Sequence, residues 1–277
     1  MPIKSIINNT IKILSFTKIG RFVESALLDR AMKRSLFASH NGCDMEFATP
    51  NPLTRWRATT FASKEPETLR WIDGMSATDV FWDIGANVGL YSIYAAKRHG
   101  LQVFSFEPSV FNLELLARNC ALNKVISTVT IIPIALSDET KVNRMQHTTT
   151  AWGGALSSFG ANFGSNGEQF DGHFEYSILG ISADELIKKK LLPPPTYMKI
   201  DVDGIEHYIL KGAGNVTRNV KSVLVEVNEG FPEQHKLVTE VLKKSGLKLV
   251  AKHTSPYTEP SQNAEVYNQI WERTNEN

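Results

Sequence analysis

Carboxylates and glycines gather in three short segments of the sequence, each at the end of an apolar run. The first is "DIGANVG", residues 83–89, and the second is the acid of "VFSFEP", Glu107. The third is "IDVDGIEH", which holds Asp201, Asp203 and Glu206. Carboxylates can accept hydrogen bonds from hydroxyls, pair with a cation, take up a proton or bind a metal. We therefore look for a ligand and for chemistry in these segments.

The glycine segment predicts a turn that a ligand approaches closely. Gly85 and Gly89 lack a Cβ, and Asn87 tolerates a left-handed conformation better than most residues. The dinucleotide fingerprint is absent, because Asn87 and Leu90 stand where its second and third glycines would be. A triphosphate-binding loop would need Lys followed by Ser or Thr, whereas Leu90 and Tyr91 follow here. Both phosphate-bearing ligands are disfavoured.

Two acids around this turn suit a nucleoside that carries an ammonium group and a free ribose. Asp83 could bind the cationic group, and the carboxylate of Glu107 could accept hydrogen bonds from both ribose hydroxyls. S-adenosylmethionine has these features and no phosphate. The alternative is that both acids only cap neighbouring helices.

The segment around Asp201 could supply the chemistry of methyl transfer to a hydroxyl. That reaction needs an in-line acceptor and removal of its proton. Asp201 is then a general base or a positioning residue, or else a Mg²⁺ ligand together with Glu226 or Asn228 of "VLVEVNE". Asp203 and Glu206 are further catalytic candidates. Their alternatives are a turn residue before Gly204 and an acid at a helix N-terminus.

Residues 139–175 interrupt the regular pattern with a polar, glycine-rich and aromatic segment. Such an insertion can be a substrate lid or a plain excursion of the chain. His147 is a candidate second base, and Trp152, Phe159 and Phe163 could stack on an acceptor.

The elements that must position these residues alternate between strand and helix from residue 79 onward. We expect an α/β, Rossmann-like class I fold: a central, mostly parallel seven-stranded sheet with helices on both faces and an antiparallel edge strand. A single strand is expected at 129–138, residues 174–189 are expected to form a strand followed by a short helix, and the last two strands pair antiparallel. Ligands of such sheets bind at the carboxyl ends of the strands. Before the domain, Ser63 is a candidate start of a helix.

Residues 1–76 are expected to form a helical extension, and residues 77–277 the main domain. The first helix is amphipathic and basic, without the ~20 apolar residues of a membrane span. It could pack on the main domain or on a partner chain, including a homodimer, or contact a membrane surface or a lipid substrate.

Composition limits the class of protein. The 277 residues carry 30 basic and 29 acidic side chains, a net charge of +1, which argues against a nucleic-acid partner. The two cysteines form neither a metal-type spacing nor a disulfide framework, which fits a reducing compartment. We expect a cytoplasmic protein, with peripheral membrane contact as the alternative.

Several ordered segments resemble the FkbM-type S-adenosylmethionine-dependent methyltransferases over about residues 60–230. They are "VFWDIGANVGLYSIYAA", "VFSFEPSVFNLELLARN", "ALSD" and "MKIDVDGIEHYILKGA". The resemblance implies that the cofactor is lined by Asp83, Gly85, Ala86, Asn87 and Gly89, by Glu107 and Pro108, and by Ala135, Ser137 and Asp138 near the adenine.

The resemblance also implies O-methylation of a small-molecule, glycan or lipid acceptor. The acids at the two strand ends are similar to those of catechol O-methyltransferases, which bind Mg²⁺ there. Three other functions stay open: a non-catalytic nucleoside-binding module, a nicotinamide-dependent oxidoreductase and, less favoured, a nucleic-acid methyltransferase.

Overall fold

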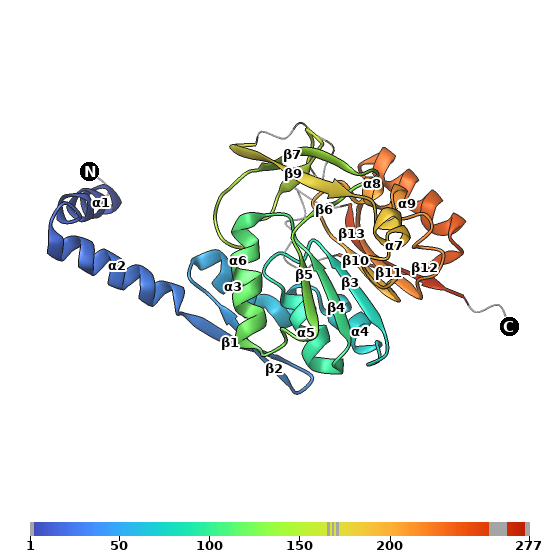
Figure 1. The fold of residues 1–277 in the computed structure, drawn as a ribbon, viewed down its shortest axis with the longest axis horizontal. Helices are drawn as coiled ribbons and strands as arrows, with labels where there is room; N and C mark the ends of the chain where they lie inside the picture. The colour runs from blue at the N-terminus through green and yellow to red at the C-terminus, as the bar shows by residue number, and fades with distance from the viewer. Residues whose placement is uncertain (1–2, 165–166, 168, 170–171, 255–264, 275–277) are drawn as a thin grey trace.

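The computed structural model describes residues 3–164, 167, 169, 172–254 and 265–274 (Figure 1). Its centre is a seven-stranded sheet with the order β12-β13-β11-β10-β3-β4-β5. The strands are β3 (Val80–Ile84), β4 (Gln102–Phe106), β5 (Val129–Ile132), β10 (Tyr197–Ile200), β11 (Ser222–Asn228), β12 (Leu247–His253) and β13 (Val266–Arg273).

The direction of the strands confirms the predicted class of fold. Strands β5, β4, β3, β10 and β11 pair parallel, whereas β13 pairs antiparallel with both β11 and β12. The reversed strand is therefore β13, which lies next to the edge strand β12.

Helices cover both faces of this sheet, as alternating side chains in its strands require. Phe81 points into a core shared with α3 (Pro52–Lys64), α4 (Pro66–Asp73), α5 (Leu90–His99) and α6 (Val110–Leu122). Trp82, the next residue, points into the opposite core, which includes α7 (Ala183–Lys188), α8 (Glu206–Lys211) and α9 (Pro232–Lys244). Successive residues of a strand face opposite sides, so both cores are built from the same strands.

The region before the main domain differs from its predicted structure in two places. Strands β1 (Ser35–His40) and β2 (Cys43–Ala48) form a hairpin where helices and loops were expected. Its two-residue turn, Asn41-Gly42, has positive φ at both positions. The Asn-Gly pair is the signal in the sequence that predicts such a hairpin. Ser63 does not begin a helix: it lies in the last turn of α3, which Asn51 caps. Helix α3 ends just before Glu65, which precedes Pro66, because the residue preceding a proline avoids the helical conformation.

A second, four-stranded sheet has the order β6-β9-β7-β8. Its strands are β6 (Ala135–Leu136), β9 (Phe174–Ile181), β7 (Lys141–His147) and β8 (Ser157–Phe159). The strand expected at 129–138 is thus split between the two sheets at Pro133, which cannot donate to a ladder. Met145 and Phe159 pack on Ile205, just beyond the end of β10, so this sheet stands over the carboxyl end of the main one.

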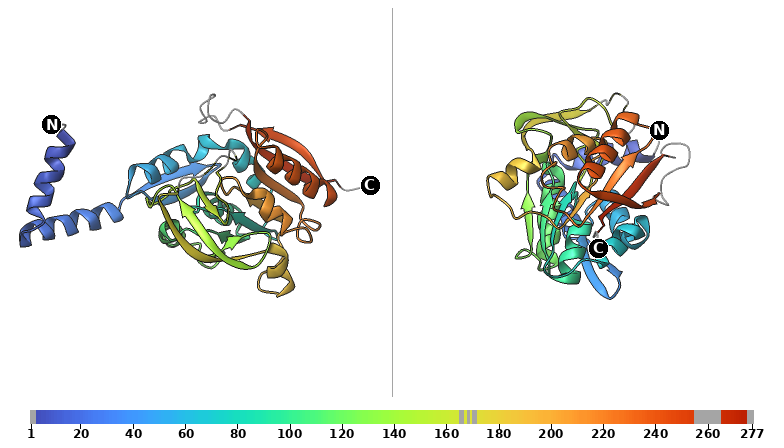
Figure 2. Two further views of the ribbon diagram at one scale, coloured as in Figure 1. Left: turned by 90° about the horizontal axis from the view of Figure 1, so that it is seen from above. Right: turned by 90° about the vertical axis from the view of Figure 1, so that its right-hand side faces the viewer.

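Two N-terminal helices, α1 (Ile3–Leu14) and α2 (Lys18–Met32), project from the rest of the molecule (Figures 1 and 2). Helix α1 contacts α2 rather than the main domain, so the packing of this segment on the domain is not observed. In the part of the chain that the structure describes, no helix combines the length and apolar character needed to cross a membrane.

Candidate functional site

The turn after β3 brings the backbone of two strand ends into contact. Gly85 has φ 86°, and a Cβ there would lie 1.9 Å from the carbonyl oxygen of Asp201, which follows β10. Gly85 must therefore be glycine both for its conformation and for this approach. Asn87 also has a positive φ, of 50°. Gly89 has a different role: it precedes α5, and a Cβ there would lie 2.4 Å from the Leu116 side chain.

Glu107 faces this turn from the end of β4. Its carboxylate accepts hydrogen bonds from the backbone N–H of Asn87 at 2.8 Å and of Ser109 at 2.7 Å. Only 5% of its surface is exposed, and this burial raises the pKa of the Glu107 carboxyl to about 7, against the hydrogen bonds that lower it. The carboxylate is thus held in place by the turn that it faces.

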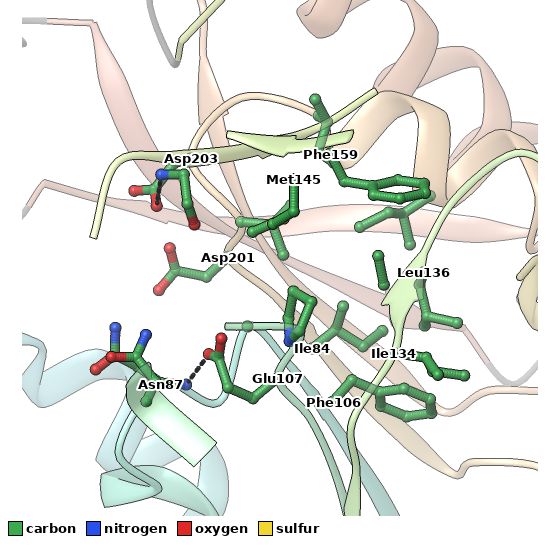
Figure 3. A pocket seen from close by; sticks show the side chains of 18 of the residues that line it. Ile84, Asn87, Phe106, Glu107, Ile134, Leu136, Met145, Phe159, Asp201 and Asp203 are labelled. Atoms are coloured by element: carbon green, nitrogen blue, oxygen red, sulfur yellow. Dashed lines mark hydrogen bonds between the residues drawn. The ribbon is translucent and has the colours of Figure 1, made fainter. Parts of the chain in front are cut away.

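A cavity opens above these residues. Figure 3 shows its two halves: one lined by carboxylates and Asn87, the other by apolar side chains. The polar half includes Glu107, Asp201 and Asp203, and the apolar half is formed by Phe106, Ile134, Leu136, Met145 and Phe159. A ligand with a flat apolar group and a hydroxyl-bearing group would match both halves.

A second cavity adjoins the first, with which it shares Gly85, Asn87 and Asp201. Its other side is formed by α3 and α5 and carries charged and aromatic groups, including Arg57, Lys64, Glu65, Tyr91 and Lys199. The two cavities meet at Asp201.

Ion pairs organise the second cavity. The Lys199 ammonium lies 2.6 Å from Asp201, and that of Lys64 lies 2.7 Å from Glu65. Burial opposes the charge of Asp201, but Lys199, Lys64 and Arg57 outweigh it and lower the pKa of the carboxyl. Burial likewise opposes the charge of Lys199, yet Asp201, Glu65 and Asp83 raise the pKa of its ammonium. Both partners of the pair are therefore ionised at neutral pH.

Arg57 is the cation of this cavity that has no ion-pair partner within the described residues. Its Nε donates to the carbonyl oxygen of Gly153 at 2.8 Å, which leaves the terminal nitrogens of the guanidinium to bind a ligand.

The insertion forms a wall of the site. The carbonyl oxygen of Gly154 accepts hydrogen bonds from the side-chain amides of Asn87 at 2.8 Å and of Asn112 at 3.1 Å. Asp203 accepts from the backbone N–H of Leu156 at 2.8 Å. Asp203 thus lines the first cavity while it anchors the insertion to the end of β10.

Four of the expected cofactor residues do not line either cavity: Asp83, Gly89, Ser137 and Asp138. Asp83 is 1% exposed and accepts a hydrogen bond from Ser92 at 2.5 Å, so it lies beneath the turn rather than in reach of a ligand. The Ser137 hydroxyl donates a hydrogen bond to the Asp138 carboxylate, which also forms an ion pair with Lys211. The residues of that stretch that do line the first cavity are Ile134, Ala135 and Leu136. Ala86 lines the second cavity and Pro108 the first.

Two catalytic candidates are also outside both cavities. Glu206 is fully buried and accepts hydrogen bonds from the backbone N–H of Val202 and of Gly204, at 3.0 and 3.1 Å, which gives it a role in holding the loop after β10. His147 is buried, and its ring stacks on Tyr176 with centroids 5.2 Å apart. Of the aromatic residues expected to stack on an acceptor, only Phe159 lines a cavity; Phe163 stacks on His207.

The structure does not support a metal site at the three residues considered as Mg²⁺ ligands. Asp201 is paired with Lys199, and the Asn228 side-chain oxygen accepts the N–H of Gly230 at 2.9 Å. Burial, then the charges of Asp201 and Glu206, raise the pKa of Glu226 well above its ordinary value. Among the residues that the structure describes, no group of three or more His, Cys, Asp or Glu is placed to bind a metal. These donors therefore do not fit a metal centre.

The sequence analysis missed the contribution of α3 to the site. Arg57 and Lys64 lie seven residues apart, a spacing that puts both on one face of a helix. That spacing alone does not say which surface the face covers.

Comparisons with known proteins give the same class of molecule. The sequence profile of the family described as "Methyltransferase FkbM domain" matches residues 83–249. The hexuronic acid methyltransferase AglP of Haloferax volcanii is 26% identical over 223 residues, which span 80% of this chain and 85% of that protein.

Two further matches are shorter or weaker. The 31-O-demethyl-FK506 methyltransferase FkbM of Streptomyces tacrolimicus is 27% identical over 175 residues, 54% of this chain and 66% of that protein. A crystal structure of a methyltransferase FkbM from Methylobacillus flagellatus superposes with a TM-score of 0.48 at 17% identity, and the match covers 72% of this chain and 44% of that one.

Proposed function

The chain belongs to the FkbM family of S-adenosylmethionine-dependent methyltransferases, and we propose that it methylates a hydroxyl oxygen of a sugar or another small molecule. The observation that carries the proposal is the pairing of the Gly85 turn with the Glu107 carboxylate at the mouth of a half-apolar cavity.

We infer that the adenosine occupies the first cavity. Phe106, Ile134 and Leu136 would contact the adenine, and Glu107 would accept hydrogen bonds from the ribose hydroxyls. The missing Cβ of Gly85 would let the cofactor pass close to the backbone.

The amino-acid end of the cofactor then extends into the second cavity. That end is a zwitterion, and the cavity offers both signs of charge: Arg57 for the carboxylate and the Glu65 side chain for the ammonium. This arrangement replaces the earlier assignment of the ammonium to Asp83, which is buried beneath the turn.

Bound S-adenosylmethionine supplies an electrophilic methyl group on a sulfonium. The acceptor oxygen would form a bond to that carbon as the carbon–sulfur bond breaks and its electron pair passes to sulfur, and the hydroxyl proton would pass to solvent water. Asp201 lines both cavities, so it is the group that can accept a hydrogen bond from the acceptor hydroxyl and orient it. Its lowered pKa makes it a weak base, so positioning is its main role.

The names of the relatives support an oxygen-rich acceptor: one methylates hexuronic acid, the other a demethylated FK506. A cytoplasmic location, the absence of a nucleic-acid partner and homodimer formation stay predictions.

Isothermal titration with S-adenosylhomocysteine and with NAD tests the cofactor, and methyl transfer from radiolabelled S-adenosylmethionine to a set of p-nitrophenyl glycosides tests the reaction. We expect binding of S-adenosylhomocysteine alone and labelled glycoside. Binding of NAD without S-adenosylhomocysteine would support the oxidoreductase alternative. Cofactor binding without transfer to any glycoside or polyol would favour the non-catalytic module.

A further inference from the structure

Helices α1 and α2 form an N-terminal arm, residues 3–34, with a defined corner. A Cβ on Gly20 would lie 1.8 Å from the carbonyl oxygen of Leu14, so the two helices meet closely. Thr17 accepts a hydrogen bond from the N–H of Gly20 at 2.9 Å and donates one to Leu14 at 2.8 Å. The arm therefore has a hydrogen-bonded corner, and it extends away from the methyltransferase domain (Figure 2).

The arm exposes an unusual set of large apolar side chains. Six of them expose between 59% and 78% of their surface: Ile13, Phe16, Ile19, Phe22, Leu27 and Leu28. Ile19, Phe22 and Val23 follow one another at helical spacing, with Leu27 one turn further on. Contiguous apolar surface of this kind marks a binding face.

The charge of the arm identifies what that face meets. Residues 1–34 contain seven of the 30 basic residues and two of the 29 acidic ones, a net charge of +5. The remaining residues therefore carry −4, so the whole basic excess of the chain lies in the arm. Lys18, Arg21 and Arg30 are interleaved with the exposed apolar residues of α2. Apolar side chains together with basic ones are the pattern of helices that lie in the interface of an anionic membrane.

A second copy of the chain fits this face less well. A symmetric pairing would bring two arms of charge +5 together, whereas the core of a dimer interface is depleted of charge. A phospholipid headgroup layer supplies the opposite charge, and the acyl boundary below it takes up the apolar side chains. Neither α1 nor α2 is long and apolar enough to cross the membrane, so the arm would lie along its surface.

We propose that the N-terminal arm binds the surface of membranes that contain anionic lipids. Phe16, Ile19 and Phe22 insert below the headgroups, and Lys18 and Arg21 contact lipid phosphates. The methyltransferase domain is then held next to the bilayer, and this property is independent of the acceptor that it methylates.

Vesicle flotation with the full chain tests the proposal, using phosphatidylcholine vesicles with and without about 30% phosphatidylglycerol. We expect the protein to float with the anionic vesicles, about tenfold less with neutral ones, and to be released by salt because charge contributes to binding. A variant with Phe16→Ser, Ile19→Ser and Phe22→Ser should lose at least about tenfold in binding.

The matched control is Val142→Ser, which removes an apolar side chain that is 70% exposed on β7, away from the arm. It should float like the wild type. Because the arm is remote from both cavities, the triple variant should bind S-adenosylhomocysteine with unchanged affinity, which shows that it is folded.

Two results would overturn the proposal. One is equal flotation of the wild type and the triple variant. The other is a wild-type dimer in analytical ultracentrifugation that ignores anionic vesicles and that the triple variant converts to a monomer, because the arm would then be a contact between copies of the chain.

Discussion

The Lys199 ammonium lies 2.6 Å from the Asp201 carboxylate, and the pair stands where the two cavities meet. Lys199 is 1% exposed, with its ammonium 5.1 Å from the centre of the Tyr91 ring. A buried cation thus keeps a carboxylate ionised at a position that both cavities share. This relationship makes Asp201 a fixed negative charge rather than a titrating group.

Replacing Asp201 by Asn should therefore impair turnover more than cofactor binding. The amide keeps the shape of the side chain but loses the charge that orients the acceptor and faces Lys199. We expect kcat to fall by about 100-fold, the scale of a positioned group that acts on a proton. Turnover measured with radiolabelled S-adenosylmethionine, beside the affinity for S-adenosylhomocysteine, checks this. Wild-type kcat in Asp201→Asn would remove the residue from the mechanism.

Cofactor affinity should depend on pH through Glu107. Its carboxyl has a pKa of about 7 in the protein without ligand, and ribose hydroxyls bind the ionised form. Affinity for S-adenosylhomocysteine should therefore rise as the pH rises, by about tenfold between pH 6 and pH 8, because the carboxyl must first lose its proton.

The raised pKa of Glu107 also makes stability depend on pH, in the direction opposite to that of a salt-bridged acid, whose pKa is lowered. A raised pKa means that the folded protein binds more protons than the unfolded chain between about pH 4.5 and pH 7. Stability should fall across that window as the pH rises. Glu107→Gln should flatten the pH dependence of stability in this window and that of binding between pH 6 and pH 8; unchanged slopes would assign both effects to another group.

Arg57 is expected to bind the carboxylate of the cofactor. Arg57→Gln should weaken the binding of S-adenosylhomocysteine by about tenfold. This is the low end for loss of a charged hydrogen bond, because the site is partly open to water. 5′-Methylthioadenosine has no amino-acid group, so its affinity should not change. Calorimetry with both ligands separates the effects. Equal losses for the two ligands would mean that Arg57 supports the fold of the site instead, through its bond to Gly153.

Gly85 should tolerate no side chain. Gly85→Ala places a Cβ 1.9 Å from the Asp201 carbonyl oxygen, so the ends of β3 and β10 must move apart. We expect a loss of at least about 3 kcal/mol in unfolding free energy and no binding of S-adenosylhomocysteine. Denaturant unfolding and calorimetry measure both.

Gly100→Ala is the matched control for this change. Gly100 also has a positive φ, of 68°, but a Cβ there meets nothing within 4 Å. Its cost should be the conformational term alone, about 1 kcal/mol, with cofactor affinity intact. Similar losses in both variants would show that the close approach to Asp201 is not what requires glycine.

Local patterns in the sequence determined the strands of the central sheet, the helices of the main domain and the family. The step from strand to glycine turn to helix, and the acid one strand later, depend on neighbouring residues and on φ preferences that the residue type itself sets. Gly85, Asn87, Glu107 and Asp201 could therefore be identified as residues around a cavity before any contact was known.

The tertiary structure alone decided which acids line a cavity and which are buried and hydrogen-bonded within the fold. Asp83 and Asp201 have the same side chain and lie near the ends of adjacent strands, yet one is 1% exposed beneath the turn and the other lines both cavities. Arg57 enters from a helix that precedes the domain, and the N-terminal arm stays exposed although its pattern allowed packing on the domain. These outcomes depend on contacts between segments far apart in the chain, and periodicity within one segment carries no information about its distant neighbours.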